Sequence, residues 1–235
     1  MKSVTHTSDL RLSIGRPWEI VRENLTGVIV DLYTKSGDIG NYASLIILIP
    51  DYKIGFAILA ASNHDPSSEV NVLADTITAS LLPAVDALAR RQATSNLAGT
   101  YFAGNASVNS SLALEVQPGL PGIVIASWIY KGADVVAALE GLERATAYGL
   151  DFRLYPTDLA EKVAGNSTEV AFRMVAQSRA SSGPGTFSSV CTSWGVVDGI
   201  MWGEIAIDEF VFALDDSGNA TFVSPRALRM DLARL

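Results

Sequence analysis

Residues 28–61, VIVDLYTKSGDIGNYASLIILIPDYKIGFAILAA, contain three runs rich in Val, Ile, Leu and Phe. The runs Val28–Thr34, Ser44–Ile49 and Ile54–Ala61 are separated by breaks at residues 37–42 and 50–52, which contain Gly, Asn, Pro and Asp. Such runs between turn signals are typical of adjacent antiparallel strands. The stretch therefore predicts the centre of an antiparallel sheet. Because the last two runs are almost entirely apolar, we expect both faces of this sheet to be covered.

A helix is predicted after the third run. Asp65 is a suitable N-cap, and Pro66 fits the first helical position, where a missing N–H costs nothing. Pro83 is expected to interrupt or restart the helix. Apolar residues at spacings of three and four form the face that would cover the sheet: Val70, Leu73, Ile77 and Leu81.

The character of the sequence changes near residue 94. Gly, Ser, Asn and Thr become frequent, and short apolar runs alternate with turn signals such as Pro118-Gly119. This pattern is typical of an all-β sandwich or a lipocalin-like barrel. We therefore predict an α+β protein with two domains. Residues 1–93 would form an antiparallel sheet with a covering helix, and residues 94–235 an all-β C-terminal domain.

Composition limits the range of partners. The chain is 49% hydrophobic and 18% charged, so it can build a sizeable core, and its net charge of −8 argues against a nucleic-acid partner. No unbroken apolar run reaches the roughly 20 residues of a spanning helix, and residues 1–10 lack the apolar centre of a signal peptide. The two histidines, His6 and His64, have no neighbours at ligand spacing, so we expect no metal and no cofactor.

Two signals concern the cellular compartment, and they conflict. A single cysteine, Cys191, allows no internal disulfide and suits a reducing compartment. Sequons for N-glycosylation, which operate only in the secretory pathway, point the other way. The two signals are reconciled if the chain derives from a secreted parent that has lost its N-terminal part. The five candidate sites are Asn24, Asn105, Asn109, Asn166 and Asn219.

Lys35-Ser36-Gly37 is the strongest chemical signal in the chain. The surrounding stretch resembles the third motif region of the serine β-lactamase and penicillin-binding-protein superfamily, where a Lys-Thr/Ser-Gly box lies on the edge strand lining the active site. The following Gly40 and Tyr42, the Pro-Asp after the second run and the Gly-Phe-X-Ile-Leu type of the third are similar to class C-like members. The similarity is closest to secreted β-lactamase-related proteins of filamentous fungi, whose C-terminal all-β domain resembles the segment starting with NLAGTYF at residue 96.

The resemblance implies a role for each of five residues in hydrolysis or acyl transfer at an amide or ester. Lys35 would attract a substrate carboxylate and help to polarise the nucleophile, and Ser36 would hydrogen-bond the substrate. Gly37 would leave room for substrate against the strand. The backbone N–H of Asp38 would be one oxyanion-hole donor. Tyr42 would stack on substrate or simply pack at the end of the sheet.

The chain also departs from the superfamily pattern. No Ser-X-X-Lys nucleophile box occurs in the 235 residues, so we expect no acyl-enzyme chemistry from this chain alone. The alternative is a non-catalytic or repurposed protein whose β domain binds a small apolar molecule or a partner. Without a chemical role, Lys35 would simply protect a strand edge from pairing. A chain lacking the parent's other half would also expose sheet surface, so we expect a homo-oligomer that covers it.

Overall fold

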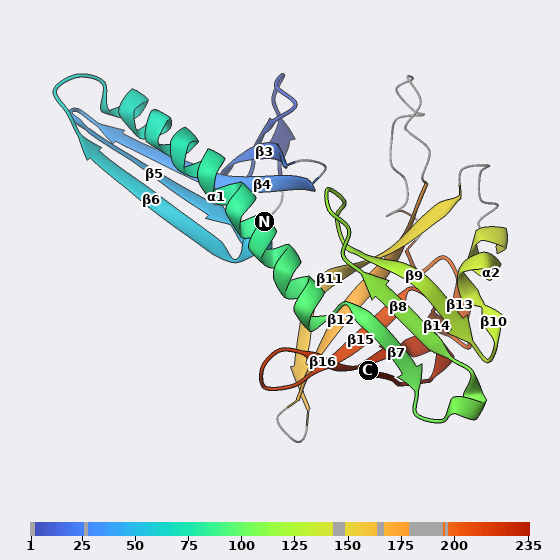
Figure 1. Cartoon of the computed structure of the whole chain (residues 1–235). Helices are drawn as coiled ribbons and strands as arrows, with labels where there is room; N and C mark the ends of the chain where they lie inside the picture. Colours follow the sequence, from blue (N-terminus) through green and yellow to red (C-terminus); the bar gives the residue numbers. More distant parts are fainter. Residues whose placement is uncertain (1–2, 26–27, 143–148, 164–166, 179–194, 196) are drawn as a thin grey trace. The chain divides into compact units, whose positions relative to one another are not determined.

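The computed structural model describes residues 3–25, 28–142, 149–163, 167–178, 195 and 197–235. The chain divides into two compact units, residues 1–90 and 91–235 (Figure 1). Both contain antiparallel sheets, and a long helix packs on the sheet of the first unit. The predicted α+β class is therefore confirmed. Whether residues 1–93 and 94–235 behave as separate domains stays a prediction.

The sheet of the first unit is built in chain order, and each strand pairs antiparallel with the next. The first two strands are short and come from residues 5–14. The strands are β1 (Thr5–His6), β2 (Leu12–Ile14), β3 (Glu19–Leu25), β4 (Val28–Ile39), β5 (Tyr42–Ile49) and β6 (Ile54–Ala61), with a 3-10 turn, η1 (Pro50–Tyr52), before β6.

Strand β4 is longer than its sequence indicates. It continues to Ile39, so Gly37 lies inside the strand and the chain turns only at Gly40 and Asn41. Gly40 has φ of +57°, a left-handed conformation that glycine adopts without strain. The predicted break at residues 37–42 is therefore too long, because a glycine in a strand does not by itself end the pairing with β5.

Helix α1 (Pro66–Asn96) follows β6 and is continuous through Pro83. The Asp65 carboxylate accepts the backbone N–H of Ser68 at 3.2 Å, which confirms the predicted cap. The expectation that Pro83 breaks the helix is wrong. Pro83 and the residue four positions earlier, Ala79, are both exposed, so water can hydrogen-bond the carbonyl that Pro83 leaves unpaired.

Among the described helices, α1 is the one long and apolar enough to cross a membrane. An 18-residue window within it has a mean hydropathy of 1.5, and 11% of that window is buried. The sequence has no unbroken apolar run of this length, because α1 mixes its apolar residues with Ser and Thr. Length and composition are weak evidence, since a helix that packs on a sheet can meet both criteria.

One face of the first sheet carries the hydrophobic core of this unit, and α1 covers it. Strand residues alternate between the two faces. On the other face Ile39, Tyr42 and Leu59 are 79%, 64% and 81% exposed. The expectation that both faces are covered is therefore wrong for the described residues of this unit. The buried residues of the core are Val30, Leu32, Ala43, Ile47, Ile49, Ile58, Val70, Ala74 and Leu82.

The second unit contains a nine-stranded antiparallel sheet that closes on itself. Neighbouring strands pair in the order β9-β11-β12-β15-β16-β17-β7-β8. Because β8 also pairs with β9, this ring closes, and β10, which pairs with β9, lies outside it (Figure 1). The sequence analysis predicts either a sandwich or a barrel. The ring of strand pairings is that of a closed sheet. The strands are β7 (Gly99–Ala103), β8 (Ser111–Glu115), β9 (Ile123–Tyr130), β10 (Ala133–Asp134), β11 (Leu150–Lys162), β12 (Thr168–Ser178), β15 (Glu209–Leu214), β16 (Ala220–Pro225) and β17 (Leu232–Arg234).

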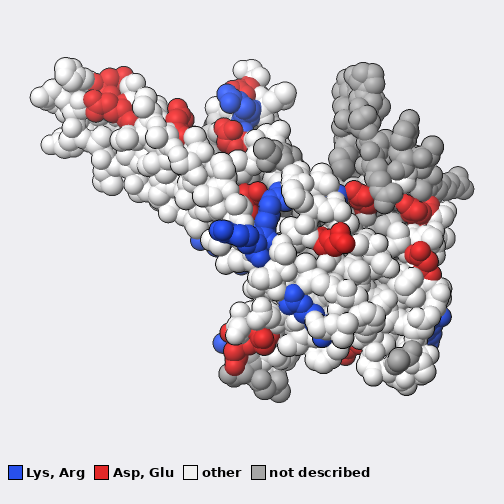
Figure 2. Space-filling view, viewed as in Figure 1, with Lys and Arg blue, Asp and Glu red and all other residues white. Residues whose placement is uncertain are grey.

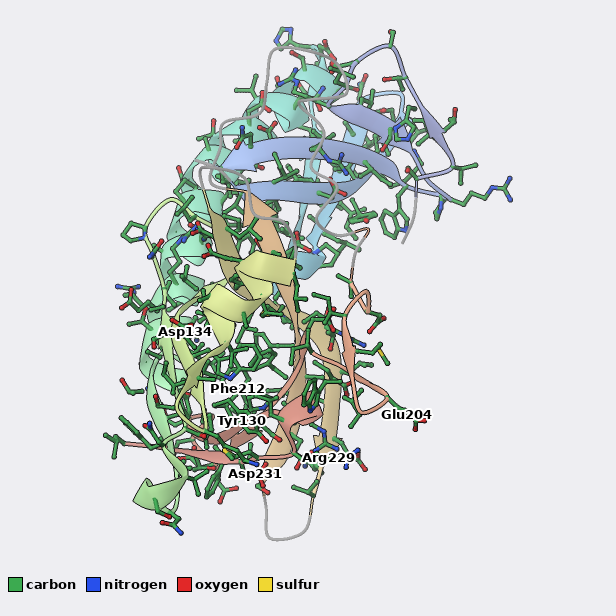
Figure 3. All side chains as sticks on the ribbon, turned by 90° about the vertical axis from the view of Figure 1, so that its right-hand side faces the viewer. Tyr130, Asp134, Glu204, Phe212, Arg229 and Asp231 are labelled. Atoms are coloured by element: carbon green, nitrogen blue, oxygen red, sulfur yellow. The ribbon has the colours of Figure 1, made fainter. Side chains whose placement is uncertain are left out.

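Aromatic side chains fill the inside of this closed sheet. Trp128 is 1% exposed, and its ring lies 5.1 Å from that of Phe210. Phe212 is fully buried, with ring centroids 5.0 Å from Phe172 and 6.3 Å from Tyr101. Figure 3 shows Phe212 among the strands and Glu204 projecting away from them. The centre of the second unit is thus a packed core.

The remaining elements of the second unit are short. Residues 133–139 look like a strand in the sequence, but Val135–Leu142 form helix α2, because the Asp134 carboxylate accepts the N–H of Ala137 and caps it. A hairpin of β13 (Met201–Trp202) and β14 (Ile205–Ala206) forms a separate two-stranded sheet. Its 3-10 turns include η2 (Ala106–Val108) and η4 (Arg226–Leu228). Cys191 lies outside the described residues.

Candidate active-site strand

The Lys35-Ser36-Gly37 motif lies where strand β4 changes from an inner strand to an edge. Strand β3 pairs with β4 from Leu25 opposite Val28 to Glu19 opposite Thr34, and no further. From Lys35 to Ile39, β4 pairs with β5 on one side only. Among the described residues no strand pairs with the other side of this segment, so strand pairing does not use its outward backbone groups.

The predicted site residues divide between the two faces of the sheet. Successive side chains of a strand point to opposite faces. Ser36 and Asp38 share the face that α1 covers, whereas Lys35, Gly37 and Tyr42 share the open face. The structure therefore does not gather the predicted residues around one point. Lys35 and Ser36 can both reach a single ligand only where that ligand lies along the open edge of β4.

Lys35 has an acidic partner that the sequence analysis missed. Its Nζ lies 2.9 Å from Oε1 of Glu19 and also donates a hydrogen bond to the backbone carbonyl of Ser36 at 3.2 Å. The side chains of Lys35 and Glu19 are 45% and 39% exposed. An ion pair this exposed is worth little, so another carboxylate can replace Glu19 at small cost.

The local packing around Gly37 explains why a glycine occurs there. The hydroxyl of Ser44 donates a hydrogen bond to the Gly37 carbonyl at 3.1 Å. A Cβ built on Gly37 would lie 3.0 Å from the same Ser44 oxygen, which is a closer contact than such atoms normally make. Gly37 thus keeps the face beside Lys35 clear.

Asp38 connects the active-site strand to helix α1. The hydroxyl of Ser67, in the first turn of the helix, donates a hydrogen bond of 2.7 Å to Oδ1 of Asp38. This contact joins residues that are far apart in the sequence. It holds the far end of β4 against the start of the helix.

A pocket of about 420 Å³ lies between this end of the sheet and α1. Ser36 and Asp38 line it, together with apolar side chains of the core. Its other carboxylates come from Glu19, Glu23 and Asp75. Because Glu23 and Asp75 would repel a carboxylate inside the pocket, an anionic substrate group fits better beside the Lys35 ammonium.

Tyr33 precedes Lys35 by two residues and lies on the same face. Burial raises the pKa of its phenol, and the carboxylates of Asp31 and Asp51 raise this pKa further. The phenol therefore keeps its proton at neutral pH and cannot serve as a ready general base. Asp31 also accepts two hydrogen bonds from Arg22, at 2.8 and 3.1 Å, which raise the pKa of that guanidinium and link β3 to β4.

Tyr42 is the first residue of β5, opposite Ile39, and its ring is exposed at the end of the sheet.

Of the predicted glycosylation sites, Asn24, Asn105 and Asn109 are exposed, and Asn219 is half-buried. Asn166 lies outside the described residues.

Sequence patterns could not have identified Glu19 and Ser67 as neighbours of the motif. Glu19 lies 16 residues before Lys35, and Ser67 lies 29 residues after Asp38. Neither belongs to a motif with a characteristic spacing. Glu19 becomes a neighbour through the pairing of β3 with β4, and Ser67 through the packing of α1 on the sheet.

Comparison with known proteins identifies relatives of most of the chain. A "Beta-lactamase-like protein" of Arthroderma benhamiae is 28% identical over 239 residues, covering 89% of this chain and 39% of the relative. Probable hydrolases of Phoma sp. and Cochliobolus lunatus are each 29% identical and cover 63% and 65% of the chain. The chain spans 25–39% of the length of these three relatives.

Structural comparison finds a weaker likeness. The octameric penicillin-binding protein homologue from Pyrococcus abyssi is 15% identical, covering 76% of this chain and 36% of that one, with a TM-score of 0.27. The family model described as "Beta-lactamase-like-like, C-terminal domain" matches residues 89–235, more than half of the chain. The predicted relationship is therefore confirmed, and the chain belongs to this β-lactamase-related family, of which it carries the C-terminal portion.

Proposed function

We propose that residues 35–39 form the substrate-binding strand of a β-lactamase-related hydrolase. In this proposal an amide or ester substrate that carries a carboxylate lies along the open edge of β4. The observation that supports it most is that β4 loses its β3 neighbour at Lys35, where Lys35 and Ser36 flank the edge from opposite faces. The names of the relatives support a hydrolase-related family.

Each residue of the strand has a part in this proposal. The ammonium group of Lys35 binds the substrate carboxylate after that carboxylate replaces Glu19. The Ser36 hydroxyl hydrogen-bonds the substrate from the other face. Backbone groups of the open edge align the substrate as an added strand, and Gly37 leaves space for it beside Lys35.

We further propose that this chain alone binds substrate reversibly and forms no acyl-enzyme. Its 235 residues contain no Ser-X-X-Lys, the box in which a lysine activates the nucleophilic serine. The Lys35 ammonium then contributes binding and no bond cleavage. Hydrolysis would need a nucleophile from residues other than these.

A binding titration tests the proposal. The probe is a penicillin with a free carboxylate, and its matched control is the methyl ester of the same penicillin. We expect the wild-type chain to bind the acid more tightly than the ester, and Lys35→Met to lose this preference. Glu19→Gln should strengthen binding of the acid, because it removes the competing carboxylate. Lys53→Met removes the same charge between η1 and β6, away from the motif, and serves as the protein control.

Two results of the titration would refute the proposal. If the wild-type chain does not bind the acid, or if Lys35→Met binds it equally well, the substrate does not use this strand. Intact-mass measurement after incubation with the penicillin should show an unchanged mass. A covalent increase would overturn the statement that this chain forms no acyl-enzyme.

The alternative is a non-catalytic protein whose β domain binds a small apolar molecule or a partner. Its support would have to come from space inside the closed sheet, where Trp128, Phe210 and Phe212 are packed against other side chains. No observation on the described residues favours this alternative, so we do not propose it.

A further inference from the structure

The sequon asparagines of the second unit differ in what surrounds their amide nitrogen. A glycan is attached through Nδ2, so this nitrogen must face solvent in the folded chain. Asn219 does not meet this condition, because it is half-buried and its side chain hydrogen-bonds Asp215. Asn109 leaves little room, because its Nδ2 lies 3.2 Å from the point that a Cβ on Gly132 would occupy. Neither nitrogen is well placed to carry a glycan.

Asn105 differs from both. It follows β7, and its side chain is exposed. Its Oδ1 accepts two hydrogen bonds from Ser107, the hydroxyl residue of its own sequon, one from the backbone N–H at 3.0 Å and one from the hydroxyl at 2.7 Å. Among the described residues no hydrogen bond uses Nδ2 of Asn105, so this nitrogen is free to carry a substituent. Figure 2 shows mainly uncharged side chains over the end of β7 and the turn that follows it.

An exposed aromatic ring precedes this asparagine by three residues. Phe102 is 39% exposed on β7. Its neighbour Tyr101 is fully buried in the core, and successive side chains of a strand point to opposite faces, so Phe102 lies on the outer face of the closed sheet. The C–H groups of a pyranose ring form an apolar face, and such a face packs on an aromatic ring as other apolar groups do. Phe102 therefore offers a surface for a sugar attached close by.

We propose that Asn105 carries an N-linked glycan and that its first sugar packs on the ring of Phe102. The donor is an oligosaccharide joined to a lipid through pyrophosphate. The Nδ2 of Asn105 forms a bond to C1 of the first sugar, the bond from C1 to the pyrophosphate oxygen breaks, and the amide gives up one proton. This chemistry belongs to the secretory pathway, so of the two conflicting compartment signals the proposal follows the sequons.

Glycopeptide mapping tests the attachment. The full chain is produced through the secretory pathway of a eukaryotic host, and we expect a glycan on Asn105. Asn105→Gln keeps an amide but removes the acceptor, and Ala106→Pro blocks the sequon while leaving its asparagine and serine in place. Both variants should lose this glycan. Asn219→Gln is the matched control and should leave the glycosylated mass unchanged apart from the substitution. An unmodified Asn105, or a glycan on Asn109 or Asn219 in its place, would overturn the proposal.

Thermal unfolding tests the contact with Phe102. The glycosylated chain should melt roughly 2–4 °C above Asn105→Gln, the shift expected for one aromatic contact in a chain of this size. Trimming the glycan to its first sugar with an endoglycosidase should preserve this difference. Phe102→Ala should abolish it.

Phe222→Ala is the control for the ring. Phe222 is 46% exposed on the same outer face, two strands away from Phe102. This variant should keep the difference in melting temperature between the chains with and without the Asn105 glycan. If Phe102→Ala also keeps the difference, or if trimming to the first sugar removes it, the first sugar does not pack on Phe102.

Discussion

The hydroxyl of Ser67 donates a hydrogen bond of 2.7 Å to the carboxylate of Asp38, and this bond joins the active-site strand to the first turn of helix α1. It is the contact that sets the far end of β4, beyond the residues that β3 supports, against the helix. The open edge at Lys35–Ile39 is thus held at one end by β3 and at the other by Ser67. The Ser67 support is a single hydrogen bond, so a substitution of Ser67 can test it.

Replacing Ser67 should loosen the end of β4. We expect Ser67→Ala to lower the free energy of unfolding by about 1 kcal/mol, the usual net value of one hydrogen bond, and to weaken binding of the carboxylate probe. Urea denaturation measures the first effect and the binding titration the second. Ser68→Ala is the matched control, because its hydroxyl is exposed beside the same helix start. If Ser67→Ala and Ser68→Ala change stability and binding equally, the hydrogen bond to Asp38 does not stabilise the end of β4.

The hydroxyl of Tyr52 fastens the later half of α1 to the sheet. It donates a hydrogen bond of 3.1 Å to Asp86, which also accepts the Nε–H of Arg90 at 2.8 Å. Burial and the nearby Asp86 carboxylate raise the pKa of Tyr52 strongly, so the phenol keeps its proton. Tyr52→Phe should cost about 1 kcal/mol of unfolding free energy in urea, whereas Tyr42→Phe, at an exposed ring, should cost much less. If Tyr52→Phe leaves the free energy of unfolding unchanged, Tyr52 does not have this role.

Alkaline pH should weaken the second unit through Tyr101. Burial raises the pKa of this phenol from 10.0 to about 12, and its hydroxyl donates a 2.6 Å hydrogen bond to the Leu97 carbonyl. The folded state holds the proton more tightly than the unfolded state. The stabilisation is therefore complete below pH 10.0 and is lost as the pH rises from there toward 12. The melting temperature should fall as the pH rises across this range. Tyr101→Phe should make this fall less steep.

Acid should weaken the turn between β15 and β16 through Asp215. Its carboxylate accepts the backbone N–H groups of Asn219 and Ser217, each at 2.9 Å, and these bonds hold the pKa of Asp215 below its usual 3.8. Because the folded-state pKa is depressed, the stabilisation is present above pH 3.8 and disappears as the pH falls through the lower folded-state value. Asp215→Asn should lower the melting temperature at pH 7, and the difference from wild type should shrink in acid. A constant difference at all pH values would contradict this account.

The strands around the motif follow from local patterns, but the end of β4 does not. Ser44–Ile49 lies within β5, and Ile54–Ala61 matches β6 fully, because both runs are apolar and end at Pro50-Asp51 or at polar residues. Gly37 and Asp38 are turn formers by composition, yet they remain in the strand because β5 pairs with them. Pro83 remains in α1, and residues 135–142 form a helix, because solvent exposure and the Asp134 cap outweigh the local preference.

By itself, the amino-acid sequence determined the α+β class, the family relationship and the position of Lys35-Ser36-Gly37. These depend on local composition and on residues adjacent in the chain. Only the tertiary structure decided that Lys35 and Ser36 lie on opposite faces of β4, that the described residues leave one edge of this strand without a strand partner from Lys35 onward, and that Glu19 and Ser67 are the neighbours of the motif. The reason is physical: strand pairing and helix packing bring together residues that no sequence spacing connects, and they determine which edge of a strand is left without a partner.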